Sequence, residues 1–149
     1  MKKILVCILA GLFSSVTAFS QSSEQFASIL KSENVTYAQL AYLPAVQAQL
    51  ISEDDSPEKA FEALSQNGYF SSTASANDEA RLDEACLLYA KLLNLKGGLF
   101  YSLFHSKRYA FKELKAKNIL PRESDPAMKI SGRDSIDLFS SCLTLSGDE

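Results

Sequence analysis

Short apolar stripes at helical spacing most strongly limit the folds open to this chain. Apolar residues recur at three- and four-residue steps in five stretches, 36–50, 57–68, 82–93, 106–120 and 131–145. This spacing lines one face of an α-helix, whereas the strict alternation typical of β-strands is hard to find. The sequence therefore predicts an all-α fold with, at most, very short extended pieces.

Capping residues indicate where several of these helices begin. Thr36 offers a hydroxyl cap, and Ser-Pro-Glu at 56–58 combines a cap, a proline at the first helical position and an acid in the first turn. Ser131 with Asp134 three residues later resembles a capping box. Pro44 should kink or split the helix that Thr36 opens, because proline cannot continue the hydrogen-bond ladder.

The remaining boundaries are predicted from weaker signals. Asn77 or Ser75 is expected to cap the helix that contains 82–93, which we predict to be the longest. Residues 99–104 are apolar and aromatic, and they fit either a short helix or a buried connector. The expected places for extended pieces are 69–70 and 119–120.

The chain contains an internal echo at a spacing of 50 residues. Ala-Phe-Glu-Ala-Leu at 60–64 answers Ala-Phe-Lys-Glu-Leu at 110–114, and each is followed by a Gly or Asn stop, an apolar pair, a polar loop and a capped helix. Residues 35–41 likewise resemble 130–136. One helical hairpin cannot bury its own apolar face, so neighbouring copies would bury each other's. The predicted organisation is a half-unit over 35–50 followed by units over 57–93 and 107–144.

The second unit carries a recognisable order of short motifs. They are Tyr109-Ala110, Leu114, Asn118-Ile119-Leu120, Asp125-Pro126, Met128 and Ile130-Ser131-Gly132-Arg133-Asp134. In this order the stretch resembles the S-layer homology domain, and the first unit and the half-unit resemble it more weakly. The resemblance implies a bundle of helical hairpins that anchors proteins to cell-wall polysaccharide. The polymer-binding arginine of that family would fall on Tyr37, Leu82 and Gly132, so the resemblance implies a scaffold without those arginines.

The N-terminus has the layout of a secretory signal peptide. Lys2 and Lys3 precede an apolar run over 4–13, and small residues at Ala18 and Ser20 precede Gln21. We therefore predict that residues 1–20 are removed and that 21–149 form a single domain in the periplasm or secreted medium of a bacterial cell envelope. Cleavage two residues earlier is the alternative.

Charge is distributed unevenly over the predicted mature chain. Removing Lys2 and Lys3 from the 15 basic residues leaves 13 against 18 acidic ones, a net charge of −5 that gives no general attraction for nucleic acid. No further apolar run approaches the length that spans a membrane. In contrast, 107–133 carries eight basic and three acidic residues. This stretch is either a solvated helix face or an anion-binding face for an acidic glycan or partner protein, with Arg108, Tyr109, Arg122 and Arg133 as the predicted binding residues.

No group of residues points to catalysis, a metal or a cofactor. His105 is the only histidine, and Glu79, Asp83 and Glu84 are explained as acids at a helix start. Cys86 and Cys142 remain after export, where an oxidising compartment permits a disulfide, and two buried thiols are the alternative.

These observations predict an exported, non-enzymatic binding or interaction module of the cell envelope. Its partner would be cell-wall polysaccharide bound through the basic face. The alternative is a structural or partner-binding subunit of an envelope protein assembly, without affinity for glycan.

Overall fold

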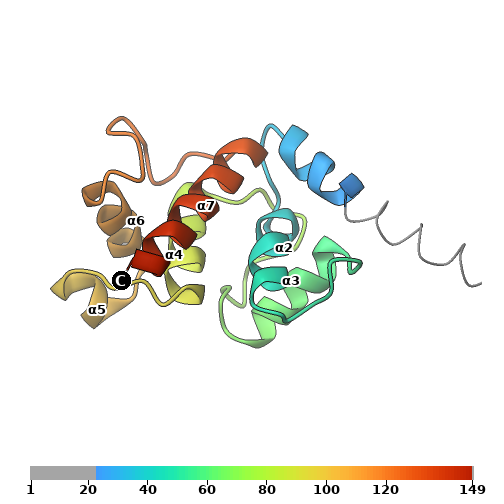
Figure 1. Cartoon of the computed structure of the whole chain (residues 1–149), viewed down its shortest axis with the longest axis horizontal. Helices are drawn as coiled ribbons and strands as arrows, with labels where there is room; N and C mark the ends of the chain where they lie inside the picture. The colour runs from blue at the N-terminus through green and yellow to red at the C-terminus, as the bar shows by residue number, and fades with distance from the viewer. Residues whose placement is uncertain (1–22, 149) are drawn as a thin grey trace, which may run out of the picture.

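The protein is described here by a computed structural model over residues 23–148 (Figure 1). The predicted signal peptide and Glu149 lie outside these residues. The predicted all-α fold is confirmed, since the described part of the chain contains helices and two isolated β-bridges but no sheet. No helix in this part is long and apolar enough to cross a bilayer. A helix over 23–31 is followed by α2 (Tyr37–Gln47), α3 (Pro57–Gln66), α4 (Leu82–Leu92), α5 (Leu99–Phe104), α6 (Lys107–Ala116) and α7 (Gly132–Asp148).

The helices pack in pairs. The two helices of a pair are not always consecutive in the sequence. The first pair is α2 with α3, and the second is α4 with α6, from which α5 projects (Figure 1). In the third pair, α7 begins against the 23–31 helix, where the Gly132 amide donates to the Ser32 carbonyl over 2.9 Å. Pairing in this way buries the apolar stripe that each amphipathic helix carries.

The path of the backbone repeats at the spacing of the sequence echo. Residues 61–80 and 111–130 have the same succession of helix, turn, bend and bridge, position by position. The helices α3 and α6 each have ten residues, and α4 and α7 begin 50 residues apart.

Equivalent hydrogen bonds hold the amino ends of the long helices. The Tyr37 amide at the start of α2 donates to Asp78 over 3.0 Å, in the loop that leads into α4. The Leu82 amide at the start of α4 donates to Met128 over 2.9 Å, in the loop that leads into α7. Since α7 in turn begins against Ser32, in the loop that leads into α2, the three junctions form a closed cycle.

Three equivalent residues meet at the centre of this cycle. Val35, Ala80 and Ile130 are buried; the Val35 amide donates to Ile130 over 2.9 Å, and the Ala80 amide donates to Val35 over 2.8 Å. The β-bridges flank them, at Thr36–Glu79 and Arg81–Lys129. Extended backbone therefore occurs here, and not at 69–70 or 119–120 as predicted, because these residues satisfy one another's backbone groups.

The predicted starts of α2 and α3 are confirmed. Thr36 and Gln39 form a reciprocal capping box, and the Ser56 hydroxyl accepts from the Lys59 amide over 3.3 Å. Pro44 lies inside α2 and does not split it.

The predicted start and length of α4 are wrong. Instead of being capped by Asn77 or Ser75, α4 begins at Leu82 after Arg81, whose side chain makes no capping hydrogen bond. The reason is that the backbone of 76–80 is already paired with 35–38. The helix ends at Leu92, and α7, with 17 residues, is longer.

Candidate functional site

The helix α5 exposes an unusual amount of apolar surface. Leu99, Phe100, Leu103 and Phe104 are each at least 60 % exposed, and only Tyr101 of its apolar residues is buried. Of the two structures predicted for residues 99–104, the short helix is confirmed, and most of its apolar side chains are exposed. A contiguous apolar patch on a globular protein commonly marks an interaction site.

Aromatic stacking fixes α5 against α6. The Tyr109 ring lies stacked against Phe100, with centroids 5.8 Å apart and planes inclined by 12°, and against Phe104, at 5.5 Å and 21°. The Glu113 carboxylate accepts from the Gly98 amide over 2.9 Å at the start of α5. These contacts hold the rings in place before any ligand arrives, so binding would cost little ordering entropy.

A groove whose lining carries one cation, Lys112, and one carboxylate, Glu113, runs between α5 and α6. It has a volume of about 410 Å³, and its lining includes Phe100, Tyr109 and Lys112. Arg108 lies one helical turn before Lys112, so the two cations project from one side of α6. We call this region the aromatic–basic surface; it comprises Leu99, Phe100, Leu103, Phe104, Arg108, Tyr109 and Lys112.

Of the four predicted binding residues, two belong to this surface. Arg108 and Tyr109 are adjacent on α6, with the arginine exposed. Arg122 lies in the loop after α6, and Arg133 lies in the first turn of α7, both exposed. Within residues 23–148, no hydrogen bond, ion pair or ring contact joins either of these to Arg108 or Tyr109. The four-residue site remains a prediction.

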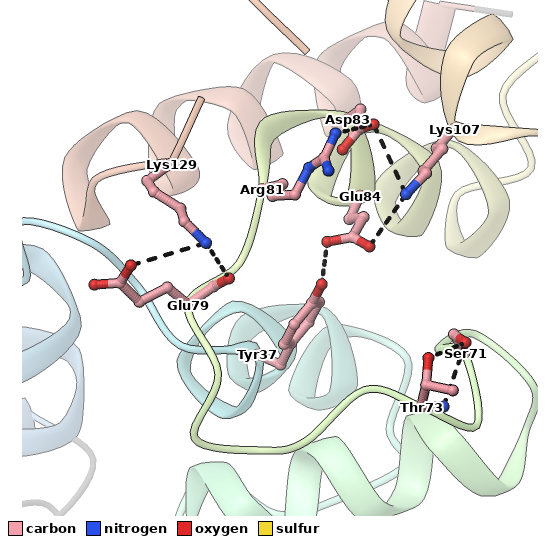
Figure 2. Close-up of polar contacts among 9 residues, drawn as sticks. All are labelled: Tyr37, Ser71, Thr73, Glu79, Arg81, Asp83, Glu84, Lys107 and Lys129. Carbon is pink, nitrogen blue, oxygen red and sulfur yellow. Dashed lines mark hydrogen bonds and ion pairs between the residues drawn. The ribbon is translucent and has the colours of Figure 1, made fainter. Parts of the chain in front are cut away.

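Some of the predicted basic face is used within the fold. Lys107 lies 3.5 Å from Glu84 and 4.0 Å from Asp83, and Lys129 lies 3.8 Å from Glu79 (Figure 2). These lysines connect α6 to α4 and the two repeated loops to each other. They are half-exposed, so each pair contributes little stability on its own, but their charge is not free for a ligand.

A polar cluster lies where α2, α4 and α6 meet (Figure 2). The Tyr37 hydroxyl donates to Glu84, and burial together with this carboxylate raises the tyrosine pKa. Arg81 pairs with Asp83 over 3.1 Å; Asp83 is buried, and its Oδ1 has no hydrogen-bond partner in the described chain. Asp83 and Glu84 lie in the first turn of α4, as predicted for acids at a helix start, whereas Glu79 precedes the helix. The opposed charges in this cluster tie the helices together.

The remaining candidate groups are His105 and the two cysteines. His105 ends α5 in a left-handed conformation, exposed, with its ring 5.3 Å from Tyr101. Cys86 and Cys142 are buried free thiols that link α4 to α7 by packing; burial raises the pKa of Cys142 to about 12. Burial, then the neighbouring Cys142, raises the pKa of Cys86. Over 23–148, no three metal-ligating side chains gather.

The exposed face of α5 was missed in the sequence, although a signal was present. The five apolar residues within 99–104, which follow Gly97-Gly98, are too few to make two-sided contact with a core. Gly97 allows the close approach of Tyr101, since a Cβ there would lie 2.5 Å from its ring.

The chain matches no protein-family model, no curated protein and no solved structure.

Proposed function

We propose that the protein is an exported, non-enzymatic binding module of the bacterial cell envelope, and that its aromatic–basic surface binds an acidic cell-wall glycan. The observation that carries the proposal is the stack of Phe100, Tyr109 and Phe104, with Lys112 in the same groove and Arg108 exposed one helical turn before it on α6. Export is inferred from the N-terminal sequence pattern.

The surface combines the two contacts that an acidic sugar requires. The apolar face of a sugar ring packs flat against an aromatic side chain, as the exposed rings of Phe100 and Phe104 allow. Carboxylate or phosphate groups on the polymer accept hydrogen bonds from a guanidinium or ammonium group, here Arg108 and Lys112. Binding of this kind is weakened by salt, because the cations are exposed.

The test is co-sedimentation of the purified protein with isolated cell-wall and outer-envelope fractions at low and high salt. The double variant Arg108→Ala/Lys112→Ala should lose at least about fivefold of its wall affinity at low salt. Arg122→Ala/Arg133→Ala removes the same charge elsewhere and should retain binding. Undiminished binding by the first double variant would rule out the aromatic–basic surface as the glycan site.

A second candidate function is favoured by the aliphatic part of the surface. Leu99 and Leu103 are 72 % and 64 % exposed, and leucine offers little to a sugar but much to an apolar protein surface. In this case the chain is a subunit of an envelope protein assembly without glycan affinity. Leu99→Ser/Leu103→Ser would then abolish cross-linking to a specific envelope protein, and no wall binding would be seen with the unmodified chain at any salt concentration.

A further inference from the structure

The junctions at the starts of α2 and α4 are equivalent but are filled differently. Tyr37 and Leu82 are the first residues of their helices, and their amides donate to Asp78 and Met128, which are equivalent in the repeat. The side chains at these two positions therefore enter the same place in successive copies of one framework.

At the first junction, the Tyr37 side chain occupies this place. Its ring packs edge-on against Phe70, with centroids 5.5 Å apart, and lies 6.4 Å from Phe61. Its hydroxyl donates to Glu84 in the first turn of the next long helix, α4 (Figure 2). A phenol ring thus spans the gap between one helix start and a carboxylate on the next.

At the second junction, the equivalent residues are smaller. Leu82 takes the place of Tyr37, Leu120 that of Phe70, and Asp134 that of Glu84. No phenol ring crosses this junction, and a pocket of about 310 Å³ lies between these residues. Its lining consists of Leu82, Ile119, Leu120, Pro121, Ser124, Met128, Ile130, Asp134, Asp137, Leu138 and Ser141.

At the third junction, the corresponding space is closed. Gly132 begins α7, and a Cβ added there would lie 1.7 Å from the Ile29 carbonyl oxygen. The backbone of the 23–31 helix therefore occupies the space that corresponds to the one filled by the Tyr37 side chain at the first junction. In the part of the chain that the structure describes, the pocket at the second junction combines apolar side chains with two carboxylates, Asp134 and Asp137.

We propose that this pocket binds the side chain of a tyrosine from a partner polypeptide, with the ring on Leu82 and Leu120 and the hydroxyl donating to Asp134. The model for the occupant is the chain's own Tyr37 at the equivalent place. The charges agree with it, since Asp134 and Asp137 line the pocket and favour a hydrogen-bond donor over an anion. Asp134 Oδ2 accepts from the Ser131 hydroxyl over 2.7 Å, so the tyrosine hydroxyl would donate to Oδ1. None of the pocket residues belongs to the aromatic–basic surface, so the inference does not depend on the proposed function.

A polypeptide fits this pocket better than a free phenol does. Small-molecule sites range over about 300–1,000 Å³ and bury most of their ligand, so this pocket is at the lower limit. Asp134 and Asp137 are also exposed residues, so the pocket is open at their side. Additional contacts from neighbouring peptide backbone would supply the affinity that one buried ring lacks.

The test uses the methyl group of Met128 as a reporter. The chain has two methionines, Met1 in the predicted signal peptide and Met128 in the lining of the pocket. Protein labelled with ¹³C at methionine methyl groups is titrated with the acetylated, amidated tripeptides Ala-Tyr-Ala and Ala-Phe-Ala, and with p-cresol. We expect a saturable shift of the Met128 signal with Ala-Tyr-Ala, and about tenfold weaker binding of Ala-Phe-Ala. A lack of saturation, or equal affinities for the two peptides, would overturn the proposal.

The p-cresol titration distinguishes the two sources of a phenol ring. It should bind several-fold more weakly than Ala-Tyr-Ala, because it lacks peptide groups. If p-cresol binds as tightly or more tightly, the occupant is a small phenol and the partner polypeptide is excluded.

Two variants locate the hydroxyl. Asp134→Ala should remove the preference for tyrosine over phenylalanine. Asp137→Ala is the matched control and should keep that preference. The residue equivalent to Asp137 at the first junction is Leu87, which contributes no carboxylate to the contact with Tyr37. An unchanged preference in Asp134→Ala would contradict the proposed geometry.

If that variant does not fold, Leu82→Tyr gives an independent test. Its new ring should fill the pocket from within, shift the Met128 signal without ligand and abolish peptide binding; retained binding would overturn the proposal.

Discussion

Replacement of Gly132 by alanine should separate the third helix pair. The added Cβ would lie 1.7 Å from the Ile29 carbonyl oxygen, 2.7 Å from the Ile29 carbonyl carbon and 3.3 Å from the Leu30 carbonyl carbon. Ordinary contact begins at 3.4 Å, so the 23–31 helix and α7 must move apart by roughly 1.7 Å. The obstacle is backbone, so no change of side-chain rotamer relieves it.

The cost follows from what this movement disrupts. Overpacking in a close-packed region costs about 1–3 kcal/mol, and loss of Ile29 burial costs up to about 1.5–3 kcal/mol more. Alanine regains less than about 1 kcal/mol of helix propensity, because Gly132 is at the first helical position. We therefore expect Gly132→Ala to lower the free energy of unfolding by about 2–4 kcal/mol.

The matched control is Gly147→Ala in the same helix. Nothing lies within 4 Å of a Cβ at Gly147, so this variant should be stabilised by up to about 1 kcal/mol. Urea unfolding followed by circular dichroism gives both values from the midpoints and slopes. If Gly132→Ala unfolds within about 0.5 kcal/mol of the unmodified protein, the two helices do not meet at Gly132.

Three further predictions concern the repeat and the core. Leu64 and Leu114 are equivalent and fully buried, so each Leu→Ala variant should lose about 2–5 kcal/mol in urea unfolding; a small loss at one site would mean that the units pack differently. Ser56 and Ser106 precede equivalent helices, but only Ser56 caps through its side chain. Ser56→Ala should therefore lower the urea midpoint by the equivalent of about 1 kcal/mol, and Ser106→Ala should not change it. Burial raises the pKa of Cys142 from an ordinary 9.0 to about 12, so its contribution is complete below pH 9 and is lost as pH rises toward 12. Urea midpoints measured from pH 7 to 11 should fall, and less steeply in Cys142→Ala.

The sequence predicts the elements of this fold well where local chemistry decides them. Thr36 and Ser56 cap helices because their hydroxyls reach an amide three residues later, and the surrounding structure need not be known. The start of α4 could not be predicted in the same way. Asn77 and Ser75 are good capping residues. However, backbone hydrogen bonds between 76–80 and 35–38 hold this segment outside the helix, and they depend on residues that are distant in the sequence.

The candidate site was predicted only in part, for a related reason. The eight basic residues in 107–133 suggested an anion-binding face. However, Lys107 and Lys129 form ion pairs with acidic residues that are remote in the sequence. Likewise, the aromatic residues near Tyr109 divide between core and surface, with Tyr101 buried and Phe104 exposed. The position of each on α5 depends on how that short helix rests on α6, which six residues do not encode alone.

Comparison of the three junctions gives physical meaning to residues that look unrelated in the sequence. Tyr37, Leu82 and Gly132 begin equivalent helices. None of the three is charged, and an anionic polymer would also meet Glu84 or Asp134 beside the first two. Arg81 and Lys107 near the first junction are already paired with Asp83 and Glu84, and the pocket lining at the second junction contains no cation, so neither junction offers a positive charge to an acidic glycan. If the protein binds one, the cations must come from outside the junctions, and exposed Arg108 and Lys112 beside an aromatic stack meet that requirement.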